Sequence, residues 1–121
     1  MEGYARGLER YCTGRNGYAQ GANRAAYQGT CPKPLEAEFL RGYHMGAELA
    51  DARERLAQMS HRIGELRERL APREHQDGRP AAEPLSEADQ IAMAVELGEL
   101  LVRRERAEDE VRALESRGAD Y

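Results

Sequence analysis

The sequence is poor in the residues that build a thick globular core. It contains no Trp, a single Phe and 6% aromatic residues in all, whereas 33% of its 121 residues are charged. A chain of this length forms one small domain at most, and this composition favours thin burial of helix against helix. The longest apolar runs, such as Ile91 to Val95, fall far short of the roughly 20 residues that a membrane span needs.

A surplus of cations is also absent. The 18 basic and 22 acidic residues leave a formal net charge of −4, and the two signs are interleaved along the chain. Nucleic-acid binding needs a cationic patch or stripe, so we expect no nucleic-acid partner. Four acid-first pairs have the i,i+4 spacing that supports a helix: Asp51–Arg55, Glu65–Arg69, Glu99–Arg103 and Glu108–Arg112.

The composition changes abruptly near residue 46. Six of the seven aromatic residues, eight of the twelve glycines and both cysteines lie in the first 46 residues, and no aromatic residue occurs from His44 to Asp120. We therefore expect a head at residues 1–46, followed by a charged tail that is stabilised by repeated helix contacts.

Residues 34–71 are predicted to form one long amphipathic helix that continues from the head. Pro34 suits a first helical turn and Pro72 ends the helix. Apolar residues recur at alternating spacings of three and four, the a/d pattern of a coiled coil. The expected seam consists of Leu49, Ala52, Leu56, Met59, Ile63, Leu66 and Leu70.

A second amphipathic helix is predicted at residues 85–118, after a flexible connector at residues 72–84. Ser86 supplies an N-cap and Gly118 a C-cap glycine. Apolar residues between Ile91 and Val102 cover more than one face, so this stretch is expected to meet more than one neighbour. The expected seam consists of Met93, Leu97, Leu100, Arg104, Ala107, Val111 and Leu114.

The head contains the pattern Gly-Tyr-x-x-Gly three times. On a helix, two glycines four residues apart share one face and allow another backbone to approach closely, while the adjoining Tyr covers the contact. A groove lined by tyrosines that binds a small ligand is the alternative interpretation. The residues concerned are Gly3, Tyr4, Gly7, Gly17, Tyr18, Gly21, Gly42, Tyr43 and Gly46.

Cys12 and Cys31 enclose eighteen residues that contain several turn-forming Gly and Asn residues. A disulfide between them would stabilise a head that has few core residues. Free buried thiols, or a metal-binding or catalytic thiol, are the alternatives. A zinc site is disfavoured because no Cys-x-x-Cys pair occurs and His44 follows Cys31 only after thirteen residues.

No catalytic constellation stands out from the helical charges. We find no Ser/His/Asp set, phosphate-binding glycine loop or distinct carboxylate pair. The three histidines, His44, His61 and His75, are expected to be solvated. We therefore expect no enzyme activity, no cofactor and no metal.

Three motifs occur in order at the start of the chain: Leu8-x-x-Tyr11-Cys12, Asn16-Gly17-Tyr18 and Tyr27-x-Gly29-x-Cys31-Pro32. With Glu38-Phe39-Leu40 and the third glycine repeat, they resemble the bacterial domain of unknown function 2799 family over residues 3–46. The resemblance implies small, often lipid-anchored cell-envelope proteins and an oxidising compartment. It also implies upstream sequence with an export signal and a lipidation cysteine, so we expect this chain to be truncated at its N-terminus. It brings no known activity.

The sequence thus predicts an all-α protein in which a disulfide-pinned helical head precedes a long helical hairpin or antiparallel coiled coil. We expect a non-catalytic structural or protein-interaction module of the periplasm or outer membrane, touching the membrane only through its missing anchor. A homodimer formed through the tail is the expected assembly, with an envelope protein as a further partner. The alternative is a small-ligand-binding protein or thiol-dependent enzyme that uses the Tyr and Cys residues of the head.

Overall fold

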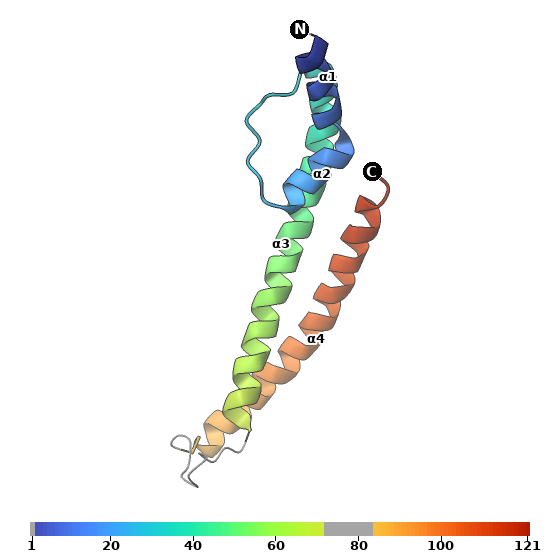
Figure 1. Cartoon of the computed structure of the whole chain (residues 1–121). Coiled ribbons are helices and arrows are strands. Elements are labelled where there is room, and N and C mark those ends of the chain that lie inside the picture. The colour runs from blue at the N-terminus through green and yellow to red at the C-terminus, as the bar shows by residue number, and fades with distance from the viewer. Residues whose placement is uncertain (1, 72–83) are drawn as a thin grey trace. The chain divides into compact units, whose positions relative to one another are not determined.

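Figure 1 shows the computed structural model, which describes residues 2–71 and 84–121. These residues form four helices and no strand: α1 (Glu2–Tyr11), α2 (Gly14–Ala22), α3 (Lys33–Leu70) and α4 (Glu87–Gly118). The all-α fold is therefore confirmed. None of these helices is long and apolar enough to cross a membrane. The expected connector at residues 72–84 lies outside the described residues, apart from Pro84, and stays a prediction.

The chain divides into two units, and α3 and α4 contribute to both. Unit 1 comprises residues 1–55 and 107–121, and unit 2 comprises residues 56–106. Unit 1 contains the Gly- and Tyr-rich segment that the composition sets apart. It also includes the last turns of α4, although the composition predicts that they belong only to the tail.

The disulfide between Cys12 and Cys31 is present and lies in the core of unit 1. Its Cα atoms are 5.7 Å apart. The two cysteines and Phe39 are buried together, with partly buried apolar side chains from α1, α3 and the loop around them. The ring of Phe39 is fully buried and stacks on Tyr11 at 5.5 Å between centroids. Tyr27 packs on the same ring at 5.0 Å. One disulfide and one Phe thus hold α1, the loop and α3 together.

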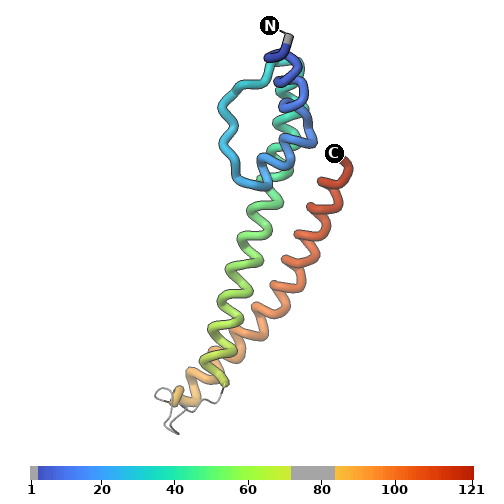
Figure 2. Tube along the Cα trace, in the orientation of Figure 1, coloured from blue at the N-terminus to red at the C-terminus, as the bar shows by residue number. Residues whose placement is uncertain are grey.

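Local capping fixes the ends of α2. The Thr13 side chain accepts a hydrogen bond from the Asn16 N–H at 3.0 Å, as an N-cap does. At the other end, the Arg24 and Ala25 N–H groups donate to the carbonyls of Gly21 and Gln20, which is a Schellman motif. Figure 2 shows the chain then bowing away from α2 before it returns to α3.

Arg24 occupies the left-handed position of that motif, with φ of 60°. This conformation costs a residue with a Cβ roughly 1–2 kcal/mol. The Arg24 guanidinium forms ion pairs with Asp51 at 2.6 Å and Glu54 at 2.8 Å on α3. These contacts favour arginine where glycine would be the usual choice.

The N-terminal end of α4 is capped as the sequence predicts, and the C-terminal end is not. Ser86 is the N-cap, because its Oγ accepts a hydrogen bond from the Asp89 N–H at 3.1 Å. Gly118, in contrast, is the last residue of the helix and does not adopt a positive φ. The predicted helix end at Gly118 is confirmed, but the glycine lies inside the helix and does not cap it through a left-handed conformation. Gly118 is buried, and a Cβ there would overlap the ring of Tyr18, which is the physical reason for glycine at this position.

The predicted seam residues are buried to different extents in the two units. In unit 1, Leu49, Ala52, Ala107, Val111 and Leu114 are buried. In unit 2, Ile63 and Leu66 are buried. The remaining residues are half-buried: Leu56, Met59, Leu70, Met93, Leu97, Leu100 and Arg104.

Several surface charges pair with residues far away in the sequence. In unit 1, Asp51 pairs with Arg24, and Arg55 pairs with Glu110 at 3.1 Å. The predicted i,i+4 pair between Asp51 and Arg55 is therefore wrong, because each has a better-placed partner on another segment. In unit 2, Arg62 binds Glu96 through two hydrogen bonds at 2.7 and 3.2 Å and thereby lowers the pKa of Glu96.

Reducing the disulfide should destabilise unit 1 by about 3 kcal/mol, because the closed loop restricts the unfolded chain. The measurement is denaturant unfolding followed by near-ultraviolet circular dichroism of the tyrosines, with and without reductant. Intact mass should rise by two hydrogen atoms on reduction. The double variant Cys12→Ala/Cys31→Ala is the control, and its unfolding should not respond to reductant. Protein purified without reductant that contains two free thiols would contradict the disulfide.

Candidate functional site

Two of the three glycine repeats meet where α2 crosses α3 in unit 1. A Cβ on Gly17 would overlap the Phe39 carbonyl oxygen, and one on Gly21 would overlap the Tyr43 carbonyl oxygen. The relation is reciprocal, because a Cβ on Gly42 would overlap the carbonyl oxygen of Gly14. One on Gly46 would overlap the Tyr18 carbonyl oxygen in the same way. The two backbones therefore touch over a full turn of each helix.

The tyrosines of these two repeats seal the crossing. The Tyr43 hydroxyl donates a hydrogen bond to the Ala25 carbonyl at 2.5 Å, which fixes the loop after α2. Tyr18 reaches the last turns of α4, where its hydroxyl lies 3.5 Å from the Leu114 carbonyl. Its ring stacks on Tyr121 at 6.0 Å between centroids. Both side chains are thus engaged inside unit 1.

The first repeat takes no part in this crossing. Nothing lies within 4 Å of a Cβ placed on Gly3 or Gly7, and Tyr4 is 69% exposed. For this repeat, the prediction of close helix packing is wrong within the described residues. The physical reason is that α1 contacts the core through Leu8 and the Cys12 segment, so its glycine face points away from the other helices.

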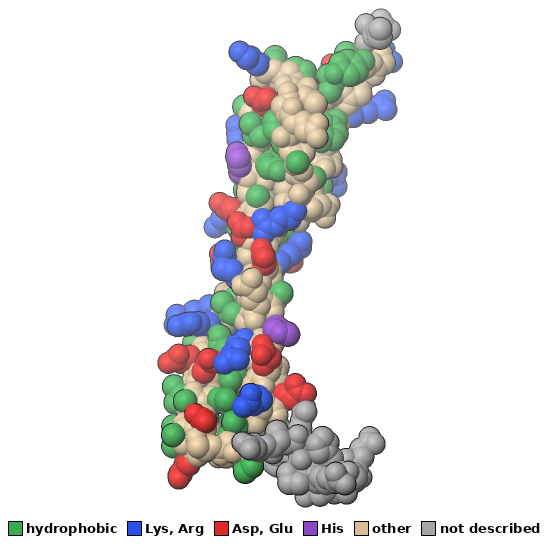
Figure 3. Space-filling model, turned by 90° about the vertical axis from the view of Figure 1, so that its left-hand side faces the viewer, with side chains coloured by type: hydrophobic (Ala, Val, Ile, Leu, Met, Phe, Trp, Pro, Cys, Tyr) green, Lys and Arg blue, Asp and Glu red, His purple; other side chains and the backbone are tan. Residues whose placement is uncertain are grey.

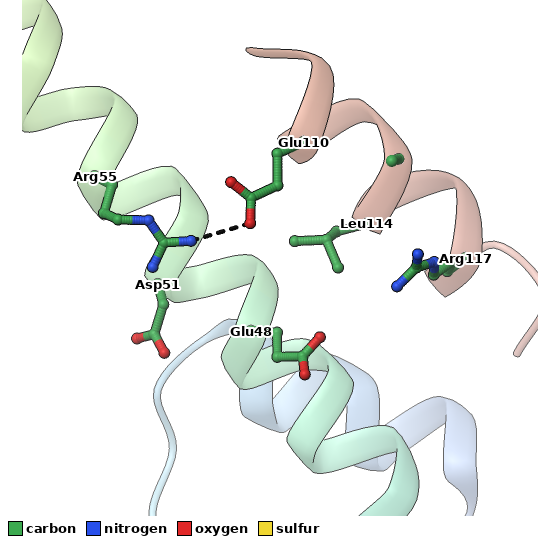
Figure 4. Close-up of a pocket in the computed structure, with 7 residues that line it drawn as sticks. Glu48, Asp51, Arg55, Glu110, Leu114 and Arg117 are labelled. Carbon is green, nitrogen blue, oxygen red and sulfur yellow. Dashed lines mark hydrogen bonds and ion pairs between the residues drawn. The ribbon is translucent and has the colours of Figure 1, made fainter. Parts of the chain in front are cut away.

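A charged groove lies between α3 and the last turns of α4 in unit 1 (Figure 4). Its volume is about 410 Å³, within the range of small-molecule sites. Leu114 projects into the groove, and the Arg55–Glu110 ion pair spans it. The residues that line it are Glu48, Asp51, Arg55, Glu110, Ala113, Leu114 and Arg117. None of them is a tyrosine, so this cavity is not the tyrosine-lined groove of the alternative interpretation.

Sequence reasoning missed this groove and the contacts of Tyr121 for the same reason. The groove brings together residues about sixty positions apart, and charged residues at helical spacing look alike whether they line a cavity or face water. The sequence held one sign of the contact between Tyr18 and α4, which is Gly118 at the end of a long helix. A glycine at that position also fits a C-cap, so the contact could not be inferred from it.

Burial raises the pKa of two head tyrosines. For Tyr18 the main cause is burial, with a further increase from Glu115 and an opposing effect of Arg53. For Tyr27 burial again leads, followed by the hydrogen bond that its hydroxyl donates to Glu36 at 2.8 Å. The neutral phenols are therefore the forms that the folded head favours.

The described residues contain no group of three or more His, Cys, Asp and Glu side chains that could hold a metal ion. His44 and His61 are exposed, and His61 lies 3.3 Å from Glu65, while His75 lies outside the described residues. Both cysteines are bonded to each other. Neither cysteine of the described head is therefore a free thiol.

Comparison with known proteins agrees with the resemblance of the head. Residues 1–48 match the family described as Protein of unknown function (DUF2799). No curated protein and no solved structure matches the chain. The match covers α1, α2, the disulfide and the third glycine repeat, and it stops before the heptad part of α3.

Adding a methyl group at the crossing should destabilise unit 1. Gly42→Ala and Gly17→Ala each place a Cβ against backbone atoms that cannot rotate away, so we expect a loss of roughly 1–3 kcal/mol. Gly7→Ala is the matched control: its Cβ points into open space, and the change should be neutral or stabilising by up to about 1 kcal/mol. Denaturant unfolding followed through tyrosine circular dichroism measures both. Equal effects of Gly42→Ala and Gly7→Ala would refute the crossing.

The head should lose stability at alkaline pH. A folded-state pKa above the ordinary 10.0 of Tyr means that this stability is fully present below pH 10.0 and is lost as the pH rises through the folded-state value. Thermal melts from about pH 8 to about pH 11, with absorbance of the phenolate, test this. Tyr18→Phe and Tyr27→Phe should flatten the decline, whereas the exposed Tyr4→Phe should not. A melting temperature that does not change with pH over this range would contradict the prediction.

Proposed function

We propose that this chain is a non-catalytic structural or protein-interaction module of the bacterial cell envelope, and that it associates with a second copy of itself through its helical tail. The observation that carries the proposal is an exposed apolar stripe on α4 in unit 2. Ile91, Val95 and Val102 are each more than half exposed, although their chain neighbours at seam positions are half-buried. In Figure 3, hydrophobic side chains gather on the surface at the lower end of the view, bordered by acidic ones.

The spacing of the stripe supports a helix as its occupant. Ile91, Val95, Gly98 and Val102 follow spacings of four, three and four, which is the pattern of one face in a helix pair. Gly98 has open space where its Cβ would be. In an antiparallel pair of identical helices, Ile91 would oppose Val102 of the second copy, and Val95 would fill the space over Gly98. A second copy therefore fits this stripe by shape.

The size of the stripe limits the affinity. A standard interface buries about 800 Å² per partner, and three half-exposed side chains supply only part of that area. We therefore expect weak, reversible dimerisation with a dissociation constant of roughly 10–100 μM. Because the residues of the Leu49–Leu70 seam are buried or half-buried, whereas Ile91, Val95 and Val102 are more than half exposed, the stripe is the better candidate for contact between chains.

Two features support the envelope and the non-catalytic role. A disulfide between buried cysteines suits an oxidising compartment. The resemblance to the family that matches residues 1–48 implies a small cell-envelope protein. The rival thiol enzyme needs a free thiolate, whereas Cys12 and Cys31 are bonded to each other. Localisation in the periplasm or at the outer membrane follows as part of the same proposal.

Val95→Glu should abolish dimerisation, because it buries a carboxylate in the centre of the stripe. The measurement is sedimentation velocity or light scattering over a concentration series. Gln58→Glu is the matched control: it adds the same charge at an exposed position of α3 in unit 2 and should leave dimerisation unchanged. A parent protein that stays monomeric up to about 1 mM would contradict the proposal, as would equal dimerisation of the parent and Val95→Glu.

A further inference from the structure

The charged groove of unit 1 contains two satisfied ion pairs and two charges without partners. Asp51 is paired with Arg24, and Arg55 is paired with Glu110. Glu48 and Arg117 remain: among residues 2–71 and 84–121, neither forms an ion pair or hydrogen bond through its side chain. The groove therefore offers one free carboxylate on α3 and one free guanidinium on α4.

The two free charges lie on facing helices beside a buried leucine. Figure 4 shows Glu48 on α3 and Arg117 on α4 on the facing sides of the two helices, and Leu114 projects from α4 beside them. No salt bridge joins Glu48 to Arg117 within the described residues. Leu114 is buried, and Ala113 adds a second apolar contact at the edge.

This arrangement selects a ligand by charge and shape. A carboxylate of the ligand can accept two hydrogen bonds from the planar guanidinium of Arg117. An ammonium group can bind Glu48, with the carboxylate of Asp51 one helical turn further along α3. An apolar side chain of the ligand would contact Leu114. A simple anion or cation would satisfy only one of the two free groups.

We propose that the groove lined by Glu48, Leu114 and Arg117 binds a small zwitterion with an apolar side chain, such as a free amino acid or a dipeptide. The carboxylate of the ligand pairs with Arg117 and its ammonium group pairs with Glu48. The volume of about 410 Å³ admits either ligand. The proposal goes beyond self-association and is independent of it, because every lining residue belongs to unit 1 and the exposed stripe belongs to unit 2.

The test is a titration of isotopically labelled protein with L-leucine and with the dipeptide Leu-Leu, followed by nuclear magnetic resonance. We expect saturable shifts at the amides of Glu48, Leu114 and Arg117 and at the Nε–H of Arg117. N-acetyl-leucine and leucine amide each lack one charge and should bind about tenfold more weakly, which corresponds to about 1.4 kcal/mol. Whichever of L-leucine and Leu-Leu binds more tightly shows whether a single amino acid or a dipeptide fits between Glu48 and Arg117.

Glu48→Gln and Arg117→Gln should each weaken binding about tenfold while leaving the melting temperature unchanged, because both side chains are exposed. The matched control is Arg112→Gln, which removes an exposed cation of α4 that pairs with Asp109 and does not line the groove. Its affinity for leucine should equal that of the parent protein. No saturable shift with either ligand would overturn the proposal. Equal binding of the capped analogues, or of the Glu48→Gln and Arg117→Gln variants, would also overturn it.

Discussion

Contact between the backbones of α2 and α3 is the constraint on which unit 1 depends. At Gly17, Gly21, Gly42 and Gly46, there is no room for a side chain. This approach brings Phe39 beneath the disulfide and carries Tyr18 to the end of α4, where Gly118 leaves room for its ring. A head with one Phe and no Trp is thus held by close backbone packing, one disulfide and stacked tyrosines, rather than by a large apolar volume.

This packing has consequences for the surfaces that remain available. Tyr18 and Tyr43 make their contacts inside unit 1. The tyrosines of the second and third glycine repeats therefore do not line a binding groove. The last turns of α4 instead form a cavity with α3, in which Glu48 and Arg117 keep their charges unpaired. Unit 2 contributes a different kind of surface, the apolar stripe around Val95. Unit 1 thus carries a charged groove and unit 2 a candidate helix-pairing face.

The sequence predicted the elements better than their contacts. The bounds of α3 and α4 follow from Pro34, Pro72 and the Ser86 cap, which are local signals. The repeats indicated close helix packing, but three identical patterns could not reveal which two would meet, because that depends on the turn after Tyr11 and on the disulfide. Asp51 and Arg55 matched a helical pair, yet Arg24 and Glu110, from distant segments, bind them instead. Local spacing describes one helix, and tertiary contacts override it.

The most direct test of the close crossing is the set of nuclear Overhauser contacts between α2 and α3 in solution. The structure predicts contacts from the Hα protons of Gly17, Gly21, Gly42 and Gly46 to the amide protons of Tyr43, Ala47, Tyr18 and Ala22, respectively. Such contacts require the two backbones to touch, and no arrangement with side chains between the helices would give them. Observation of all four would establish the crossing. Their absence, in protein with an intact disulfide, would contradict this account.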